Sequence, residues 1–171
     1  MCIRDSIYSA ALKRGELDEI YYREMLASTT QLNAVGAELP DLAEVHAVTD
    51  VTGFALLGHA LEMCRGASLS LSLDVARLPL FAGALKLAQS GIGTGAAKRN
   101  WASYGAEVTL ADDIAAWQRD LLCDPQTNGG LLIACAPSAA PGVLKLLGAR
   151  GFARACEIGQ FTTGSAGIRV N

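Results

Sequence analysis

The side chains best placed to do chemistry are Thr49, Asp50 and Thr52, which stand together immediately before an apolar stretch with helical spacing. They belong to the motif TDVTGFALLGH at residues 49–59. A helix start offers unpaired backbone N–H groups and the positive end of the helix dipole, so it attracts anions such as phosphate. A carboxylate beside it can hold the Mg²⁺ that accompanies a polyphosphate. The motif therefore predicts a Mg²⁺–phosphate site with Asp50 as the metal ligand.

The same residues have a second interpretation. A Thr or Asp before an apolar run is also the ordinary N-cap signature, in which the side chain accepts a hydrogen bond from a helix N–H. In that case Asp50 would only start a helix. Taken alone, the motif is more typical of a capped helix start than of a binding site.

The other reactive side chains do not form a recognisable catalytic set. His46 and His59 lie thirteen positions apart, and neither flanks a nucleophile elbow or completes a zinc-binding helix pattern, so we expect satisfied, partly buried histidines. Cys123 is predicted at a helix C-terminus, where the dipole raises a thiol pKa, and we interpret it as structural. Asp124 is a second candidate cation ligand, although an Asp-Pro turn explains it equally well.

The opening motif is predicted to form a strand-to-helix turn. A short strand at residues 45–48 leads into it, and a helix at residues 53–65 follows with apolar residues at helical spacing. Upstream, two helices are expected, and Ile20, Met25 and Leu32 are predicted to form the buried face of the second.

The glycine-rich segment at residues 91–100 is interpreted as a loop. It is either a phosphate contact or a flexible linker in which Lys98-Arg99 is only a solvated pair. The remaining elements predict an α+β domain of layered sheet and helices. They are helices at 7–14, 81–89, 112–122 and 141–149, strands at 68–75, 131–135, 154–160 and 166–170, and a dense turn at 124–130.

The composition of the chain argues against nucleic-acid-binding and membrane proteins. A chain of 171 residues fits one domain with a real core, and a formal net charge of −3 gives no basic surface for nucleic acid or an anionic membrane. No apolar run reaches the roughly 18 residues of a membrane span, and no signal peptide is apparent, so we expect a cytoplasmic protein. The five cysteines contain no Cys-x-x-Cys pair and are expected to be reduced.

Three segments together resemble one family, the selenophosphate synthetases, also called selenide, water dikinases. They are TDVTGFALLGH at residues 49–59, Arg99-Asn100 followed by ASYG at 102–105, and LCDPQTNGGLL at 122–132. The resemblance runs from about Ile7 to Val170 and concerns the C-terminal half of that family. The first and third motifs are quite specific within the wider superfamily that includes aminoimidazole ribonucleotide synthetase.

The resemblance implies a fold like the aminoimidazole ribonucleotide synthetase C-terminal domain. It also implies an enzyme that converts ATP, selenide and water to selenophosphate, AMP and phosphate, with Mg²⁺ holding the triphosphate. The family's N-terminal half carries the nucleophilic Cys or selenocysteine, an essential lysine and most metal-binding aspartates. None of these is in this chain, so we expect no catalytic residue here, no activity alone, and a homodimer formed by the full-length enzyme mainly through the absent half.

By position in the motif, the resemblance assigns the single metal-ligating aspartate of the C-terminal half to Asp50. Thr49, Thr52 and Gly53 would shape the anion-binding helix start, and Asn100 would reach the same cleft. These assignments agree with phosphoryl transfer, in which catalysis consists mainly of positioning and of neutralising charge on phosphate oxygens.

The chain departs from the family pattern at several positions. Ala55 stands where the family usually has Gly, Asn128 where it often has Ser, and residues 95–97 read Gly-Ala-Ala instead of Gly-Gly-Thr. Residues 1–6 do not fit, so we expect a non-native or unstructured start and one domain over residues 7–171. Two alternatives are a non-catalytic phosphate- or nucleotide-binding module and the C-terminal half of a purine- or thiamine-pathway enzyme; the 124–130 turn favours the synthetase over the latter.

Overall fold

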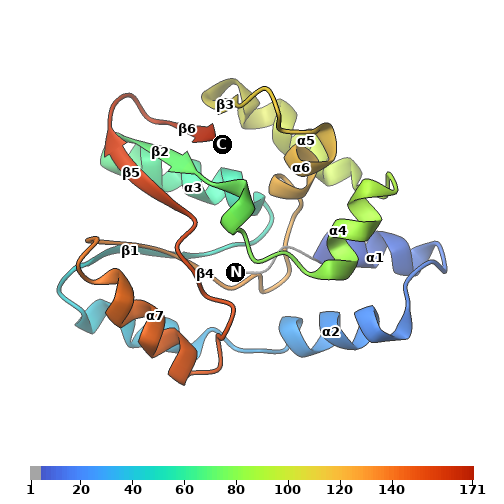
Figure 1. The fold of residues 1–171 in the computed structure, drawn as a ribbon, viewed down its shortest axis with the longest axis horizontal. Coiled ribbons are helices and arrows are strands. Elements are labelled where there is room, and N and C mark those ends of the chain that lie inside the picture. The colour runs from blue at the N-terminus through green and yellow to red at the C-terminus, as the bar shows by residue number, and fades with distance from the viewer. Residues whose placement is uncertain (1–4) are drawn as a thin grey trace.

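The computed structural model describes residues 5–171 and contains two sheets flanked by helices (Figure 1). The four-stranded sheet has the order β3 (Val108–Leu110), β6 (Gly167–Val170), β2 (Leu69–Leu73), β5 (Gly159–Thr163). Its β2 is parallel to β6 and antiparallel to β5, and β6 is parallel to β3. The second sheet pairs β1 (Val45–Asp50) with β4 (Leu131–Cys135) in antiparallel register. The predicted α+β class is confirmed.

The helices cover both sheets. The central one, α3 (Ala55–Ala67), contacts β2 and β6 on one side and α5 and α6 on another; α4 contacts α6 and α1, and α7 lies next to β1 and β4 (Figure 1). The other helices are α1 (Asp5–Lys13), α2 (Glu19–Thr29), α4 (Ala82–Gln89), α5 (Gly95–Tyr104), α6 (Ala116–Leu122) and α7 (Ala140–Ala149). Short 3₁₀ turns span Ala34–Ala37, Leu39–Asp41, Val75–Arg77 and Gly105–Glu107. Within residues 5–171, no helix has the length and apolar character needed to cross a membrane.

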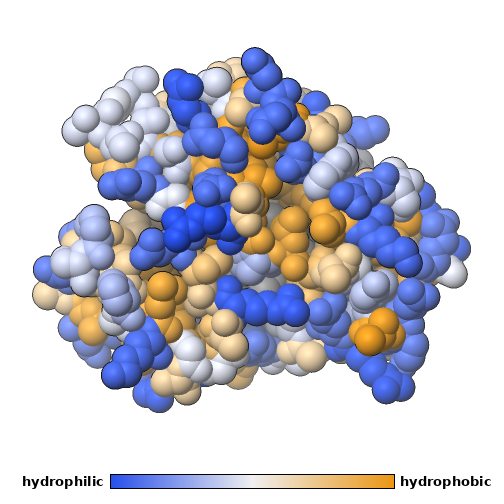
Figure 2. Space-filling view, viewed as in Figure 1, coloured by the Kyte–Doolittle hydropathy of each residue, from blue (hydrophilic) through white to orange (hydrophobic). Residues whose placement is uncertain are grey.

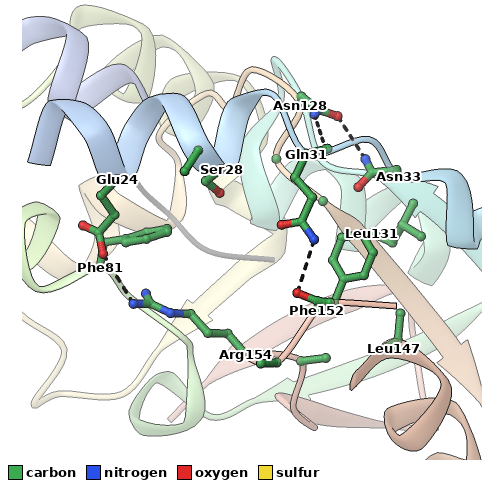
Figure 3. A pocket seen from close by; sticks show the side chains of 16 residues that line it. Glu24, Ser28, Gln31, Asn33, Phe81, Asn128, Leu131, Leu147, Phe152 and Arg154 are labelled. Atoms are coloured by element: carbon green, nitrogen blue, oxygen red, sulfur yellow. Dashed lines mark hydrogen bonds and ion pairs between the residues drawn. The ribbon is translucent and has the colours of Figure 1, made fainter. Parts of the chain in front are cut away.

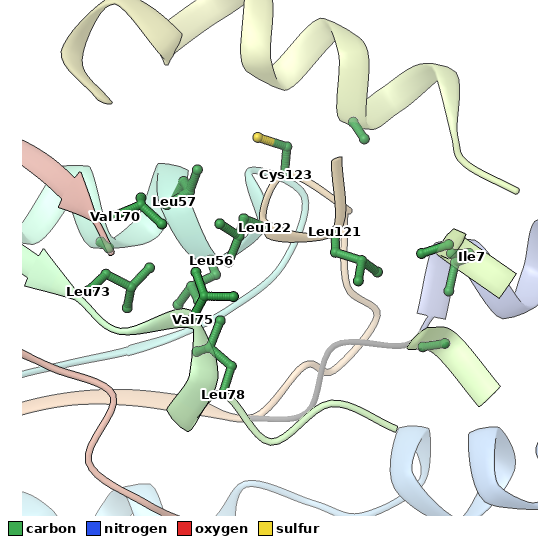
Figure 4. Packing of buried hydrophobic residues seen from close by; sticks show 14 of the residues in the cluster. Ile7, Leu56, Leu57, Leu73, Val75, Leu78, Leu121, Leu122, Cys123 and Val170 are labelled. Carbon is green, nitrogen blue, oxygen red and sulfur yellow. The ribbon is translucent and has the colours of Figure 1, made fainter. Parts of the chain in front are cut away.

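The main core lies between α3 and the four-stranded sheet and continues to α1 and α6 (Figure 4). Leu56 and Leu57 of α3, Leu73 of β2 and Leu122 of α6 are almost completely buried in it. The alternation that predicted a strand near residues 68–75 is confirmed, because Leu71 and Leu73 point inward while Ser70 and Ser72 are half-buried. This packing holds the start of α3 in place.

Two sequence predictions about helix faces are wrong. Ile20 is 71% exposed, and Leu32 is 78% exposed and lies beyond the end of α2. Residues five positions apart, such as Ile20 and Met25, project about 140° apart around a helix, so they cannot share one face. Met25 instead packs against the core together with Tyr21, four positions earlier.

The predicted loop at residues 91–100 is also wrong in its second half, because α5 starts at Gly95. The Thr94 hydroxyl accepts a hydrogen bond from the Ala97 N–H at 3.1 Å and caps this helix. The strand predicted at 154–160 is displaced to β5, and the three-residue β3 was not predicted. At the start of the chain, α1 begins at Asp5, and residues 1–4 lie outside the described residues.

A groove of about 710 Å³ separates the two sheets on the face shown in Figure 2. It is lined by β4, by residues 155–162 and by side chains of α3 and α7. Figure 2 shows apolar atoms gathered near the middle of this face inside a largely hydrophilic surround. The residues of the opening motif from Thr49 to Phe54 do not line this groove.

Candidate functional site

The turn at residues 124–130 lies directly against the end of β1. The Val51 N–H donates to the Gly130 carbonyl at 2.9 Å, and the Gly129 N–H donates back to the Val51 carbonyl at 3.2 Å. The Gln126 N–H donates to the Thr52 carbonyl at 3.0 Å. A Cβ on Gly129 would overlap the Val51 carbonyl oxygen, so this approach requires glycine. The first and third sequence motifs thus form one backbone-bonded unit.

Asn100 of α5 ties the second motif to this unit. Its Nδ2 donates to the Gly53 carbonyl at 2.9 Å and to the Cys123 carbonyl at 3.0 Å. The structure therefore brings Asn100 to the edge of the predicted site. The amide NH₂ group holds two backbone carbonyls there, so the observed role of Asn100 is to position the loop.

Asp50 ends β1 on its solvent face. Along β1 the residues alternate between half-buried and exposed positions, and Asp50 shares the exposed side with His46 and Val48. Thr49 lies on the opposite, half-buried side, and its hydroxyl donates to the Asp50 carbonyl at 3.1 Å. Val51 is completely buried, Asp50 is exposed and Thr52 is partly exposed.

The capping interpretation of Asp50 is wrong. The N-cap position of α3 is Phe54, and in the described part of the chain no side chain makes a capping hydrogen bond there. Asp50 lies five residues before the first helical residue, Ala55. Within residues 5–171, no hydrogen bond or ion pair reaches the Asp50 carboxylate. The carboxylate is therefore exposed and available to a cation.

The turn into α3 contains a backbone conformation that is unusual for its residue. The Ala55 N–H donates to the Thr52 carbonyl at 3.0 Å, and Ala55 adopts φ +62°. Tyr104 stabilises the same turn, because its hydroxyl donates to the Phe54 carbonyl at 2.9 Å. The left-handed region favours glycine, which is the residue that the family pattern has at this position.

Replacing Ala55 by Gly is expected to be neutral or to raise the free energy of unfolding by up to about 1 kcal/mol. Removing the Cβ relieves about 1–2 kcal/mol of backbone strain. Two effects lower the free energy of unfolding by about 1 kcal/mol: the loss of a buried methyl group and the greater freedom of glycine in the unfolded chain. Ala55→Val should instead destabilise by about 2 kcal/mol or more. Urea unfolding of both variants measures the difference, and a Gly variant less stable than the Val variant would contradict it.

His59 occupies a polar position inside the first turns of α3. Its Nε2 lies 3.2 Å from the Thr52 hydroxyl, and its Nδ1 lies 3.1 Å from Oε2 of Glu62. The ring is 7% exposed, so the prediction of a satisfied, buried histidine is confirmed for His59. It is wrong for His46, which lies on the exposed side of β1 at an irregularity in its pairing.

Asp124 has a structural position. It is 3% exposed and accepts hydrogen bonds from the Ile7 N–H at 3.2 Å, the Thr94 hydroxyl at 3.1 Å and the Gln126 side chain at 3.4 Å. It therefore joins α1, the start of α5 and the turn, and its oxygens are occupied by these donors. Across the part of the chain that the structure describes, no group of three or more His, Cys, Asp or Glu could hold a metal ion.

Cys123 ends α6 and is completely buried. Burial raises the pKa of its thiol to about 11, and Asp120 and Asp124 add to the increase, while the hydrogen bond with Tyr104 opposes it. Because the thiolate is the reactive form, this environment suppresses nucleophilic chemistry. This environment agrees with the interpretation of Cys123 as structural.

A pocket of about 360 Å³ lies on the other side of the 128–130 turn, and sequence reasoning missed it (Figure 3). Asn128 adopts φ +52° there and donates to the carbonyls of Thr29 and Gln31. Arg154 pairs with Glu24 at 3.4 Å across the pocket. The Asn-Gly-Gly sequence was the one available signal, because asparagine tolerates positive φ. These polar groups mainly pair with one another and join α2 to the turn.

Comparison with known proteins places these features in context. Residues 5–171 match the family described as AIR synthase related protein, C-terminal domain. The chain is 51% identical over 164 residues to the selenide, water dikinase of Rhizobium meliloti (strain 1021), covering 96% of this chain and 47% of the relative. It is 51% identical to that of Burkholderia ambifaria (strain MC40-6), with coverage of 96% and 46%, and 47% identical to that of Dechloromonas aromatica (strain RCB), with coverage of 96% and 47%. The chain thus spans about half the length of these relatives.

Proposed function

Since the chain belongs to the family of AIR synthase related protein C-terminal domains, we propose that it is the C-terminal half of a selenophosphate synthetase. The complete enzyme would convert ATP, selenide and water to selenophosphate, AMP and phosphate. The names of its relatives support this assignment over a purine- or thiamine-pathway enzyme. This half would contribute a contact to Mg²⁺–ATP and no nucleophile, so it would be inactive alone.

The observation that carries the proposal is the Asp50 carboxylate. It is exposed, has no partner within residues 5–171, and lies two positions before Thr52 in the segment that leads into α3. An unpaired surface carboxylate at such a position suits Mg²⁺, which keeps several waters and needs only one or two protein carboxylates besides substrate phosphates. A single carboxylate is thus a sufficient protein contribution from this half.

The residues present fit this role as follows. Mg²⁺, when bound, would neutralise charge on the polyphosphate oxygens. Asp50 would hold it, and Gly53 would let the ligand approach the backbone, since within residues 5–171 no atom beyond its two chain neighbours lies within 4 Å of the position of an added Cβ. Asn100 would keep this loop in place through the Gly53 carbonyl. The positive end of the α3 dipole would favour the phosphate charge.

The test is to join this chain to the N-terminal half of the Rhizobium meliloti relative, which gives a reassembled enzyme. AMP and selenophosphate are then measured from ATP and selenide by chromatography and ³¹P NMR. We expect both products from the reassembled enzyme and neither from this chain alone. A soluble, folded reassembled enzyme that forms no selenophosphate would contradict the proposal.

Metal contact is tested separately on the isolated chain, without turnover. Mn²⁺ replaces Mg²⁺ at oxygen sites and broadens nearby NMR signals. We expect broadening centred on the amides of residues 50–53, and its absence in Asp50→Asn. Uniform or distant broadening would contradict a cation site at Asp50.

Replacing Gly53 by Ala is expected to separate function from stability. The position has no positive φ and open space around it, so the free energy of unfolding should change by less than about 0.5 kcal/mol. The added methyl would hinder the ligand, and kcat/KM of the reassembled enzyme should fall at least about tenfold, or about 1.4 kcal/mol. Gly66→Ala is the matched control, because Gly66 also has open space but lies near the other end of α3. Equal activity in the two variants would count against close ligand approach at Gly53.

A further inference from the structure

Glu62, His59 and Thr52 form a continuous chain of polar contacts that ends beside Asp50. Glu62 and His59 are three positions apart on one face of α3, with 3.1 Å between Oε2 and Nδ1. The other ring nitrogen, Nε2, lies 3.2 Å from the Thr52 hydroxyl in the turn before the helix. The Phe54 ring covers the imidazole, with 6.0 Å between ring centroids.

When the His59 ring is neutral, the chemistry of these groups determines the direction of both hydrogen bonds. An ionised carboxylate only accepts, so the Nδ1 that faces Glu62 must carry a proton. In the neutral imidazole Nε2 is then an acceptor, and the hydroxyl of Thr52 must donate to it. The only hydroxyl proton of Thr52 is then bonded to Nε2 of His59. Toward solvent, the Thr52 oxygen offers lone pairs and no donor.

This direction decides what Thr52 can recognise. Phosphate oxygens accept hydrogen bonds, so an acceptor-only hydroxyl gives them no favourable contact. A divalent cation, or the water molecules around it, needs oxygen lone pairs. Asp50 and Thr52 flank the buried Val51 and are both accessible to solvent, so one hydrated cation would reach both.

We propose that His59, held by Glu62, is a positioning residue that turns Thr52 into an oxygen ligand for the hydrated cation at Asp50. The cation rests on the proposed function, whereas the direction of the hydrogen bonds does not. The proposal replaces the sequence-based assignment of Thr52 to the phosphate with an assignment to the metal. It also gives His59 a role that does not require it to act as a base.

The first test determines the tautomer of His59 in the 171-residue chain. Long-range ¹H–¹⁵N NMR at about pH 8 distinguishes a proton on Nδ1 from one on Nε2. We expect Nδ1–H for His59, and His46 serves as the exposed internal reference. Glu62→Ala, at a half-exposed position, should shift His59 toward Nε2–H. A wild-type His59 that carries its proton on Nε2 would overturn the proposal.

The second test measures cation binding by the Mn²⁺ broadening described above. Thr52→Val removes the oxygen at constant shape and should weaken Mn²⁺ binding about 10-fold. Thr109→Val is the matched control and should not change it, because Thr109 is an exposed threonine of β3 outside the three motifs. His59→Leu should behave like Thr52→Val, and His59→Gln, which retains an acceptor, should restore part of the affinity.

The outcomes separate this inference from the proposed function. Absence of Mn²⁺ binding near Asp50 in the wild-type chain would overturn both. Wild-type binding that Thr52→Val and Glu62→Ala leave unchanged would overturn the inference alone. In the reassembled enzyme, Thr52→Val should raise the Mg²⁺ concentration for half-maximal activity about 10-fold and change kcat at saturating Mg²⁺ little. A lower kcat with an unchanged Mg²⁺ requirement would contradict a metal role for Thr52.

Discussion

Replacing Asp50 by Asn in the reassembled enzyme is expected to lower kcat/KM by about 100-fold or more, which is about 2.7 kcal/mol of transition-state stabilisation. Asparagine has nearly the same shape but no negative charge, so it would hold Mg²⁺ poorly against water. Stability should be unaffected, because the carboxylate is exposed and has no partner within residues 5–171. The free energy of unfolding is expected to change by less than about 0.5 kcal/mol.

The measurements are steady-state kinetics at several Mg²⁺ concentrations and urea unfolding of the isolated chain. Asp112→Asn is the control, since Asp112 is an exposed carboxylate outside the three motifs. It should leave both quantities unchanged. Wild-type kcat/KM in Asp50→Asn would contradict the assignment of Asp50 as a metal ligand. A free energy of unfolding lowered by several kcal/mol would instead indicate a structural role for Asp50.

Replacing Asp124 by Ala is expected to lower the free energy of unfolding by about 3–5 kcal/mol. The carboxylate is buried and accepts from Ile7, Thr94 and Gln126, which belong to segments far apart in the sequence. The substitution leaves the donors that face it without that acceptor in the interior. These segments position Asn100 and the 124–130 turn, so the substitution should also disorder the candidate site.

Urea unfolding of the isolated chain measures this effect, with Asp112→Ala as the exposed control. Thr94→Val, which removes one of the donors and the cap of α5, should lower stability by about 1–2 kcal/mol. If the free energy of unfolding of Asp124→Ala lies within about 1 kcal/mol of the wild-type value, the proposed structural role of this carboxylate is contradicted.

Elements with a strong local pattern were predicted closely. The helix expected at 81–89 is α4 at Ala82–Gln89, the helix at 141–149 is α7 at Ala140–Ala149, and the strand at 131–135 is β4. Their periodicity and flanking Gly or Pro residues act over a few positions. Where tertiary contacts compete, prediction was poorer: β3 is three residues long and exists through its pairing with β6, and no local pattern marks so short a strand.

The candidate site was also predicted only in part. The sequence alone determined that Asp50 and Thr52 stand two positions apart before a helix, because neighbouring residues stay neighbours in any fold. Resemblance to a family added the relevance of Asn100 and of the 124–130 turn, without showing how they meet Asp50.

Only the tertiary structure decided the roles of these residues. It showed that Asp50 has no partner among residues 5–171 and does not cap α3, that Asn100 and Asp124 hold backbone segments together, and that His59 contacts Thr52. A side chain's partners and burial depend on segments tens of positions away, whose approach is driven by the burial of the shared core. The sequence by itself therefore determined which groups are available, and the packed chain decided which of them remain free for a ligand.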